Sequence, residues 1–209
     1  MFLGTGAGLR LPPSVAPIQV VIVPIFRTDE EHASVLPIAE RLRADLAMSG
    51  VRVRLDDRDQ HRPGYKFAEW ELKGVPVRIE LGPRDVAAGY AILASRLGGE
   101  KEQVALGDIA PGMAARLASV QGALYADALA YREANTHEIA SFDAFAAGVE
   151  EQGGFWIGSW CGDGACEAAI SARTKASIRF LPLEPEDPGA ACVHCGKPGV
   201  DVATWARAY

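Results

Sequence analysis

The chain contains 209 residues, of which 49% are apolar and 23% are charged. This composition is typical of a globular protein with room for one large or two small domains. The most apolar stretch, residues 20–25, is far too short to span a bilayer, so we expect no membrane partner. The first ten residues lack the charged and apolar regions of a signal peptide, which favours a cytoplasmic location.

The formal net charge of -6 argues mildly against a nucleic-acid partner, and we expect no DNA binding. The charge is not evenly distributed. Residues 51–84 contain eight basic and six acidic side chains, whereas residues 99–151 contain three basic and nine acidic ones. The first segment therefore indicates only where RNA binding would be tolerated.

The glycine-rich start, GTGAG at residues 4–8, superficially resembles a phosphate-binding loop. Such a loop requires a strand before the glycines and a helix after them. The chain begins just upstream, and Pro12 and Pro13 follow within a few residues. The context therefore disfavours a nucleotide loop.

Strand and helix patterns alternate through residues 17–110. Residues 18–25 form a β-branched apolar run, as expected of a strand buried on both faces. Residues 29–49 have a helical apolar period closed by Gly50, and Pro37 favours a later start of the regular helix. Further predicted segments are a strand at 51–55, a loop at 56–65, a short helix at 67–73, and strands at 75–81 and 90–95. This alternation predicts an α/β fold with a mixed, mostly parallel sheet flanked by helices.

The second half of the chain changes character twice. Residues 111–150 are rich in alanine and poor in β-branched residues, which predicts a helical connector. After Gln152, Gly153 and Gly154 come all four cysteines and three of the four tryptophans. We therefore expect a separate small α+β domain at residues 151–209.

The cysteines form two close pairs, Cys161 with Cys166 and Cys192 with Cys195. Two such pairs can supply the four ligands of a tetrahedral zinc ion. Disulfides, a redox C-x-x-C motif and unligated buried thiols are the alternatives; the absence of secretory features and of a βαβ setting disfavours the first two. The spacing favours a closed structural zinc site that supports folding, with His194 outside the ligand set.

Four segments then occur in a characteristic order: GLRLPPSVAPIQVVIVPI at residues 8–25, LDDRDQHRPGYKFAEWELKGVPVRIELGPRD at 55–85, WCGDGACEAAI at 160–170 and CVHCGKP at 192–198. Together with the terminal Tyr209 they resemble the archaeal/eukaryotic-type prolyl-tRNA synthetase. The resemblance spans nearly the whole chain, and its long central motif is highly specific.

The resemblance implies a homodimeric class II ligase that joins proline to tRNA(Pro) at the expense of ATP in protein biosynthesis. Its catalytic domain would lie upstream and act as the partner of this chain. Residues 1–16 would be the remnant of the third class II motif, followed by an anticodon-binding domain at 17–110, the connector and the zinc domain. The ATP-contacting arginine of that motif corresponds to Ser14, whose hydroxyl cannot supply charge-assisted contacts to a triphosphate. We therefore expect the chain alone to be inactive.

The family recognises the two adjacent guanines of the proline anticodon. Guanine edges offer donors to a carboxylate and acceptors to arginine or lysine. Ligands of open α/β sheets bind outside the carboxyl ends of the strands. The predicted base-contacting residues there are Glu80, Arg84, Asp85 and Arg96, and the predicted phosphate-contacting residues are Arg58, Lys66 and Lys73. For each, a solvated surface charge or an ion pair is the alternative.

Three aromatic side chains, Tyr65, Phe67 and Trp70, could stack on bases, although their helical spacing indicates that at least two belong to the core. Tyr209 resembles an anchored tail that approaches the catalytic centre of the family. Two further hypotheses stay open: a decayed or structural fragment without tRNA affinity, and a trans-acting subunit of a split synthetase.

Overall fold

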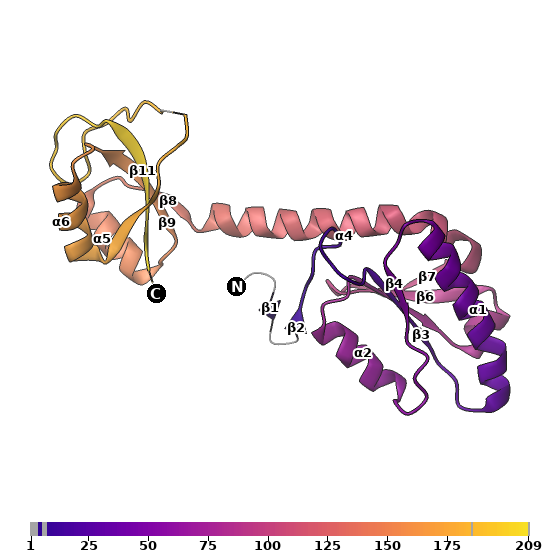
Figure 1. Cartoon of the computed structure of the whole chain (residues 1–209). Helices are drawn as coiled ribbons and strands as arrows, with labels where there is room; N and C mark the ends of the chain where they lie inside the picture. Colours follow the sequence, from indigo (N-terminus) through magenta and orange to yellow (C-terminus); the bar gives the residue numbers. More distant parts are fainter. Residues whose placement is uncertain (1–3, 6–7, 185, 209) are drawn as a thin grey trace. The chain divides into compact units, whose positions relative to one another are not determined.

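The computed structural model describes residues 4–5, 8–184 and 186–208 (Figure 1). The chain divides into two compact units, Met1–Ala128 and Leu129–Tyr209. Helix α4 (Leu106–Ala134) runs across the division. In the described part of the chain, no helix is both long enough and apolar enough to cross a membrane.

The first unit contains, besides the start of α4, the following elements in chain order: β1 (Gly4–Thr5), β2 (Gly8–Leu9), β3 (Val20–Pro24), α1 (Asp29–Met48), β4 (Val53–Leu55), α2 (Pro63–Leu72), β5 (Val77–Leu81), α3 (Pro83–Ala87), β6 (Tyr90–Ser95) and β7 (Glu102–Ala105). The two-residue strands β1 and β2 pair with each other. The other five form one sheet in the order β4-β3-β5-β6-β7.

The five-stranded sheet is mixed, which confirms the predicted α/β class. Strand β3 runs parallel to β4 and β5, whereas β6 runs antiparallel to both β5 and β7. Parallel neighbours need a crossover of a dozen or more residues. The connection from β5 to β6 contains only the short α3 and a few flanking residues, so β6 must return in the opposite direction.

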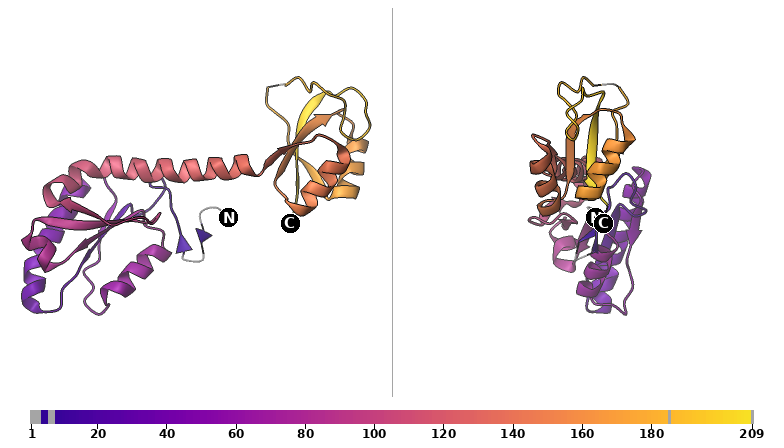
Figure 2. Two further views of the ribbon diagram at one scale, coloured as in Figure 1. Left: turned by 180° about the vertical axis from the view of Figure 1, so that it is seen from behind. Right: turned by 90° about the vertical axis from the view of Figure 1, so that its left-hand side faces the viewer.

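Strand β3 is buried on both faces, as its continuous apolar sequence predicts. Val20 and Ile22 pack with the apolar face of α1 in the main core, whereas Val21 and Val23 pack with Trp70 of α2. Helices α1 and α2 therefore cover opposite faces of the sheet (Figures 1 and 2). On the α2 side the outer strands are only partly covered, because Ile92 of β6 is half-buried and Gln103 and Ala105 of β7 are exposed.

Helix α1 covers the predicted helical stretch from its first residue, whereas α2 begins earlier than the sequence predicts. Helix α1 starts at Asp29, because the side chain of Thr28 accepts a hydrogen bond from the Glu31 N–H and caps the helix, and Pro37 is accommodated inside it. Helix α2 starts at Pro63, within the predicted loop, since proline is well suited to the first helical position. The sequence pattern did not indicate α3 or β7.

Gly74 ends α2 as predicted, with a positive φ of 73°. A Cβ atom at this position would lie 2.7 Å from the Cβ of Leu9, so glycine also lets β2 approach the end of α2. The Leu11 N–H donates to the carbonyl of Gly74 over 3.2 Å and ties the N-terminal segment to this point.

The second unit contains, after the end of α4, the elements β8 (Thr136–Glu138), α5 (Phe142–Glu151), β9 (Phe155–Trp160), α6 (Gly164–Thr174), β10 (Ala176–Phe180) and β11 (Asp201–Arg207). Its sheet has the order β10-β11-β9-β8, in which only the β8–β9 pair is parallel. Helices α5 and α6 pack through Phe145 and Ile170 against Trp156 and Trp205 of the sheet. Strand β8 and helix α5 thus lie in this unit, although both fall within the connector predicted at residues 111–150. The domain boundary expected near residue 150 stays a prediction.

Candidate functional site

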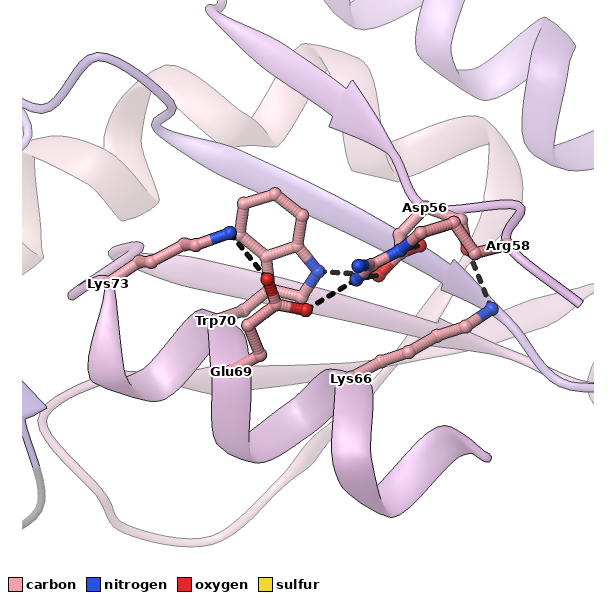
Figure 3. Close-up of polar contacts among 6 residues, drawn as sticks. All are labelled: Asp56, Arg58, Lys66, Glu69, Trp70 and Lys73. Atoms are coloured by element: carbon pink, nitrogen blue, oxygen red, sulfur yellow. Dashed lines mark hydrogen bonds and ion pairs between the residues drawn. The ribbon is translucent and has the colours of Figure 1, made fainter. Parts of the chain in front are cut away.

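Two groups of charged side chains lie on helix α2 and the strands beside it. The first follows strand β4, and we call it the Asp56 network (Figure 3); its members are Asp56, Arg58, Lys66, Glu69, Trp70 and Lys73. The Asp56 side chain is 1% exposed and accepts two hydrogen bonds of 2.7 Å from Arg58. The indole N–H of Trp70 donates a third, also of 2.7 Å. The buried carboxylate is therefore saturated by donors of the protein itself.

These contacts decide the ionisation of Asp56. Burial raises its pKa, but the hydrogen bonds from Arg58 and Trp70 and the positive charge of Lys66 outweigh burial and lower the pKa to about 2. Glu69 accepts from Lys73 and Arg58 over 2.6 Å each, and both contacts lower its pKa. The Asp56 and Glu69 carboxylates are thus ionised at neutral pH, and the network links the β4 loop to α2.

All three residues predicted to contact phosphates belong to this network. Lys66 is only 2% exposed, and its Nζ donates to the backbone carbonyl of Asp56 over 3.1 Å. Burial lowers its pKa. This placement gives Lys66 a structural contact inside the network, and its predicted phosphate contact stays a prediction. Arg58 and Lys73 are 33% and 52% exposed, so they keep partial access to solvent.

The second group lies on the other flank of α2, where the sheet is only partly covered. We call it the Arg78 cluster; its members are Phe67, Glu71, Arg78, Glu80 and Lys101. Arg78 lies over the ring of Phe67 at 4.2 Å and bonds Glu71 at 2.7 Å and Glu80 at 3.0 Å. Lys101 also bonds Glu80, at 2.8 Å. The central pair is nearly buried, but Glu71 and Lys101 at the rim are 45% and 51% exposed.

The structure brings three of the predicted base-contacting residues to one end of the sheet and places the fourth at the other. Glu80 lies near the carboxyl end of β5, and Arg84 and Asp85 follow it on α3. Arg84 is exposed, whereas the Asp85 carboxylate accepts the Gly82 N–H over 2.8 Å and caps α3. Because β6 is antiparallel to β5, Arg96 lies at the opposite end, where its Nε donates to the carbonyl of Glu71.

Glu71, Arg78 and Lys101 were not among the residues predicted from the sequence. The signal for Arg78 was the alternation of VRIEL, which places Arg78 and Glu80 on the same face of β5, away from the main core. The aromatic side chains divide as the spacing predicts. Trp70 is buried, and Phe67 packs against the same small core, while Tyr65 is exposed.

The four cysteines of the second unit converge on one point. Cys161 follows β9, Cys166 lies in the first turn of α6, and Cys192 and Cys195 belong to the turn before β11. The four Sγ atoms lie within 4.8 Å of one another, and those of Cys161 and Cys195 are 3.7 Å apart. Zinc–sulfur bonds of ~2.3 Å place tetrahedral ligands at about this separation. The cluster can therefore hold a metal ion.

The chemistry of the cluster also fits a cation. Burial and the neighbouring thiols raise the pKa of Cys166 to about 12. For Cys192 burial acts in the same direction, but backbone N–H groups of Cys195 and His194 outweigh it and lower the pKa to about 7. Four thiolates at this spacing repel one another unless a positive charge lies between them, so a metal ion would stabilise their ionised form.

The N-terminal segment supports the first unit through main-chain contacts. Residues 12–15 form a turn, and the Ser14 N–H donates to the side chain of Gln121 on α4 over 3.1 Å. Part of the GTGAG segment, residues 6–7, lies outside the described residues, as does Tyr209. The roles predicted for the GTGAG segment, Ser14 and Tyr209 therefore stay predictions.

Comparison with known proteins matches both units. Residues 19–116 match the family model "Anticodon binding domain", and residues 142–209 match "Prolyl-tRNA synthetase, C-terminal". Proline–tRNA ligase 2 of Clostridioides difficile is 42% identical over 202 residues, which are 97% of this chain and 41% of that protein. The proline–tRNA ligase of Cenarchaeum symbiosum is 42% identical over 209 residues, 100% of this chain and 43% of that protein.

A solved structure has the same arrangement of elements. Giardia lamblia prolyl-tRNA synthetase in complex with prolyl-adenylate matches with a TM-score of 0.90 and 30% identity, over 100% of this chain and 46% of that one. The chain thus spans less than half the length of the relatives that it matches.

Proposed function

Because the chain belongs to the prolyl-tRNA synthetase family and comprises its anticodon-binding and C-terminal domains, we propose that it binds the anticodon loop of tRNA(Pro). The observation that carries this proposal is the match of residues 19–116 to the anticodon-binding model, over the unit that contains the Arg78 cluster. The chain would serve the ligation of proline to tRNA with ATP, together with the catalytic domain of the family. The homodimeric assembly and cytoplasmic location expected of the family are part of the same proposal.

Base recognition would use the partly covered side of the sheet and its carboxyl end. Glu71 is half-exposed, and its carboxylate can accept from N1–H and N2–H of a guanine in exchange for Arg78. Lys101 and Arg84 are exposed and can donate to O6 and N7. Glu80 and Asp85 already accept hydrogen bonds from donors of the protein, so they would orient the residues that contact the base.

A structural module without tRNA affinity is the second candidate. The observation that favours it is the internal pairing of the Arg78 cluster, in which Glu71, Arg78, Glu80 and Lys101 satisfy one another. RNA binding has to replace some of these pairs, and the exchange costs part of the binding energy.

The test compares binding of a tRNA(Pro) transcript with that of a transcript whose two anticodon guanines are replaced. Recognition of the guanine edges predicts that the natural transcript binds more tightly by about 1–3 kcal/mol per base. The preference should persist at physiological salt, whereas non-specific phosphate binding weakens steeply. Equal binding of the two transcripts at every salt concentration would favour the structural module.

We also propose that Cys161, Cys166, Cys192 and Cys195 hold a structural zinc ion. A bound ion would fix the turn before β11 to the start of α6, with no position left for a reactive water. Native mass spectrometry should find one zinc per chain, and chelation should unfold the second unit while amide protection in β3 and β5 persists. A folded, metal-free second unit with reactive thiols would contradict the proposal.

A further inference from the structure

The sheet of the second unit carries an open cavity on the face opposite to its helices. Helices α5 and α6 pack against Trp156 and Trp205 on one face (Figure 1). Because side chains alternate along a strand, the neighbouring residues Phe155 and Ala206 face the other side. A cavity of about 560 Å³ lies there, and its volume falls within the range of ligand pockets. All of its lining residues belong to the second unit.

Positive charge is concentrated at this cavity. Residues 129–209 contain six basic and eleven acidic side chains, counting Lys and Arg against Asp and Glu. Three of the six basic side chains line the cavity, namely Arg132, Arg179 and Arg207. None of its described lining residues is acidic, and Glu133 lines an adjoining cavity of about 320 Å³ together with Arg132. Charges of one sign in a concave site attract a ligand of the opposite sign, here an anion.

No carboxylate in the described part of the chain pairs with these three arginines. Arg132 and Arg207 are exposed, and neither forms a salt bridge with any described residue. Arg179 donates from Nε and Nη2 to the carbonyl of Ala206, over 3.2 and 3.0 Å, and a neutral carbonyl does not cancel its charge. The terminal carboxylate belongs to Tyr209, outside the described residues, and would offset at most one of the three charges. The cavity therefore keeps an excess of positive charge.

An aromatic ring forms part of the cavity wall. Phe155 is 39% exposed and lines both this cavity and the adjoining one. Its N–H donates to the carbonyl of Asn135 over 2.8 Å, which fixes the start of β9 to the end of α4. A Cβ atom at Gly154 would collide with the same carbonyl, so glycine permits this close approach. The ring is thus held by the backbone in the same cavity as the three guanidinium groups.

Resting on the proposed tRNA binding, we propose that this cavity binds a single-stranded segment of the tRNA outside the anticodon loop, with phosphates on Arg132 and Arg207 and a base on Phe155. Guanidinium groups match the geometry of phosphate oxygens and bind them through paired hydrogen bonds. Positive grooves that also present aromatic rings are typical of sites for single strands, whose bases are free to stack on side chains. The anticodon loop itself is assigned to the first unit, so this contact is a second one.

The test uses Arg132→Ala, Arg207→Ala and Phe155→Leu in the full chain, with Arg173→Ala as the matched control. Arg173 lies on α6, outside the cavity, is 60% exposed and pairs with Asp143 at 2.8 Å. Affinity is measured over a range of salt concentrations for four RNAs: the tRNA(Pro) transcript, the guanine-replaced transcript, the isolated anticodon stem-loop and a short single-stranded oligonucleotide. A glutamate-rich peptide serves as the probe for an acidic protein surface.

Each arginine-to-alanine substitution in the cavity should weaken the oligonucleotide and both transcripts by roughly tenfold, as expected for a lost hydrogen bond to a charged group. Each should also lower the slope of log affinity against log salt by about 0.7, the value for one phosphate contact of a single strand. Phe155→Leu should weaken the same RNAs by at least about fivefold, the lower bound for a lost base stack, without changing the slope. Binding of the anticodon stem-loop should not change, and Arg173→Ala should leave every quantity unchanged.

Circular dichroism and thermal unfolding report the fold of each variant. If an alanine or leucine variant unfolds, Arg132→Lys, Arg207→Lys and Phe155→Tyr take its place. The lysine variants should keep the salt slope and lose part of the affinity, because lysine keeps the charge but not the paired hydrogen bonds. Phe155→Tyr should bind like the wild-type chain, because the ring is retained.

Three results would overturn the proposal: cavity variants that bind the oligonucleotide like Arg173→Ala, an equal loss of affinity for the anticodon stem-loop, or tighter binding of the glutamate-rich peptide than of the oligonucleotide. The last result would assign the cavity to an acidic protein surface. The proposed anticodon recognition fails separately, when the wild-type chain binds the natural and the guanine-replaced transcript equally. A loss of oligonucleotide binding in the cavity variants would then still support the second RNA site.

Discussion

Helix α2 contributes to two charged groups, the Asp56 network on one flank and the Arg78 cluster on the other. The Asp56 network is built around a carboxylate that is 1% exposed and receives three hydrogen bonds from the protein. The Arg78 cluster has a covered centre, but Glu71 and Lys101 at its rim are about half exposed. The first group holds the β4 loop to α2, whereas the second is the group that we propose exchanges partners with RNA.

Residue type alone does not separate structural charges from the charges that we propose to bind RNA. Lys66 and Lys101 both neutralise acidic neighbours, yet Lys66 is buried and Lys101 is half exposed. A buried group cannot reach a ligand without losing its partners. Substitutions in the two groups should therefore change different properties of the chain. Those of the buried members of the Asp56 network should affect stability, and those at the rim of the Arg78 cluster should affect RNA binding.

The largest expected effect on stability belongs to Asp56→Ala. This change leaves the Arg58 guanidinium and the Trp70 indole N–H without their acceptor, and breaking such a buried pair costs about 3–5 kcal/mol. Urea unfolding, followed through the amide signals of β3 and β5, measures the loss. The control is Glu71→Ala, which removes a half-exposed partner and should cost less than about 1 kcal/mol. Similar losses in the two variants would remove the distinction.

The second largest effect on stability is expected from acidification, which should weaken the Asp56 network. The pKa of Asp56 is lowered to about 2, below the ordinary value of 3.8, so its contribution is complete above pH 3.8 and disappears as the pH falls through about 2. The shift corresponds to about 2 kcal/mol of stability. The difference in unfolding free energy between the wild-type chain and Asp56→Asn should therefore shrink from pH 5 to pH 2. A constant difference would mean that the charge of Asp56 does not stabilise the fold.

Lys66→Met should have a smaller effect on stability, and none on RNA binding. The substitution removes the donor to the Asp56 carbonyl but also the burial of a charge, so we expect a loss of about 1 kcal/mol. Affinity for the tRNA(Pro) transcript should stay at the wild-type value. A weaker, less salt-dependent complex would show that Lys66 contacts phosphate after all.

Lys73→Ala should change stability least. Its pair with Glu69 is an exposed pair one helical turn apart, and such pairs contribute less than about 0.5 kcal/mol. If Lys73 contacts a phosphate, as its exposure permits, both transcripts should bind more weakly by the same factor. Thermal unfolding and the two binding curves measure these quantities, and a loss of more than about 1 kcal/mol would place Lys73 with the buried members of the network.

The sequence predicted the features that depend on local pattern. The β-branched run of β3, the glycines that end α1 and α2, and the two cysteine pairs are readable without tertiary contacts. The start of α2 was missed, because the polar sequence around Pro63 is compatible with either a loop or a first helical turn.

The candidate site was harder to predict, because it depends on strand direction and burial. Arg96 follows a strand, but the antiparallel direction of β6 moves it away from Glu80 and Arg84. Lysine is usually a surface residue, and only the packing of α2 against the β4 loop buries Lys66. Glu71 and Lys101, 30 residues apart in the numbering, meet around Arg78 and Glu80 only through the pairing of β5, β6 and β7.

The central claim is that the rim of the Arg78 cluster recognises guanine, and replacing the anticodon guanines by inosine tests it most directly. Inosine lacks the N2 amino group that a carboxylate would accept from. The wild-type chain should bind the guanine transcript more tightly than the inosine transcript by about 1–3 kcal/mol, and Glu71→Ala should bind the two equally. A Glu71→Ala variant that keeps the full preference for guanine would contradict the claim.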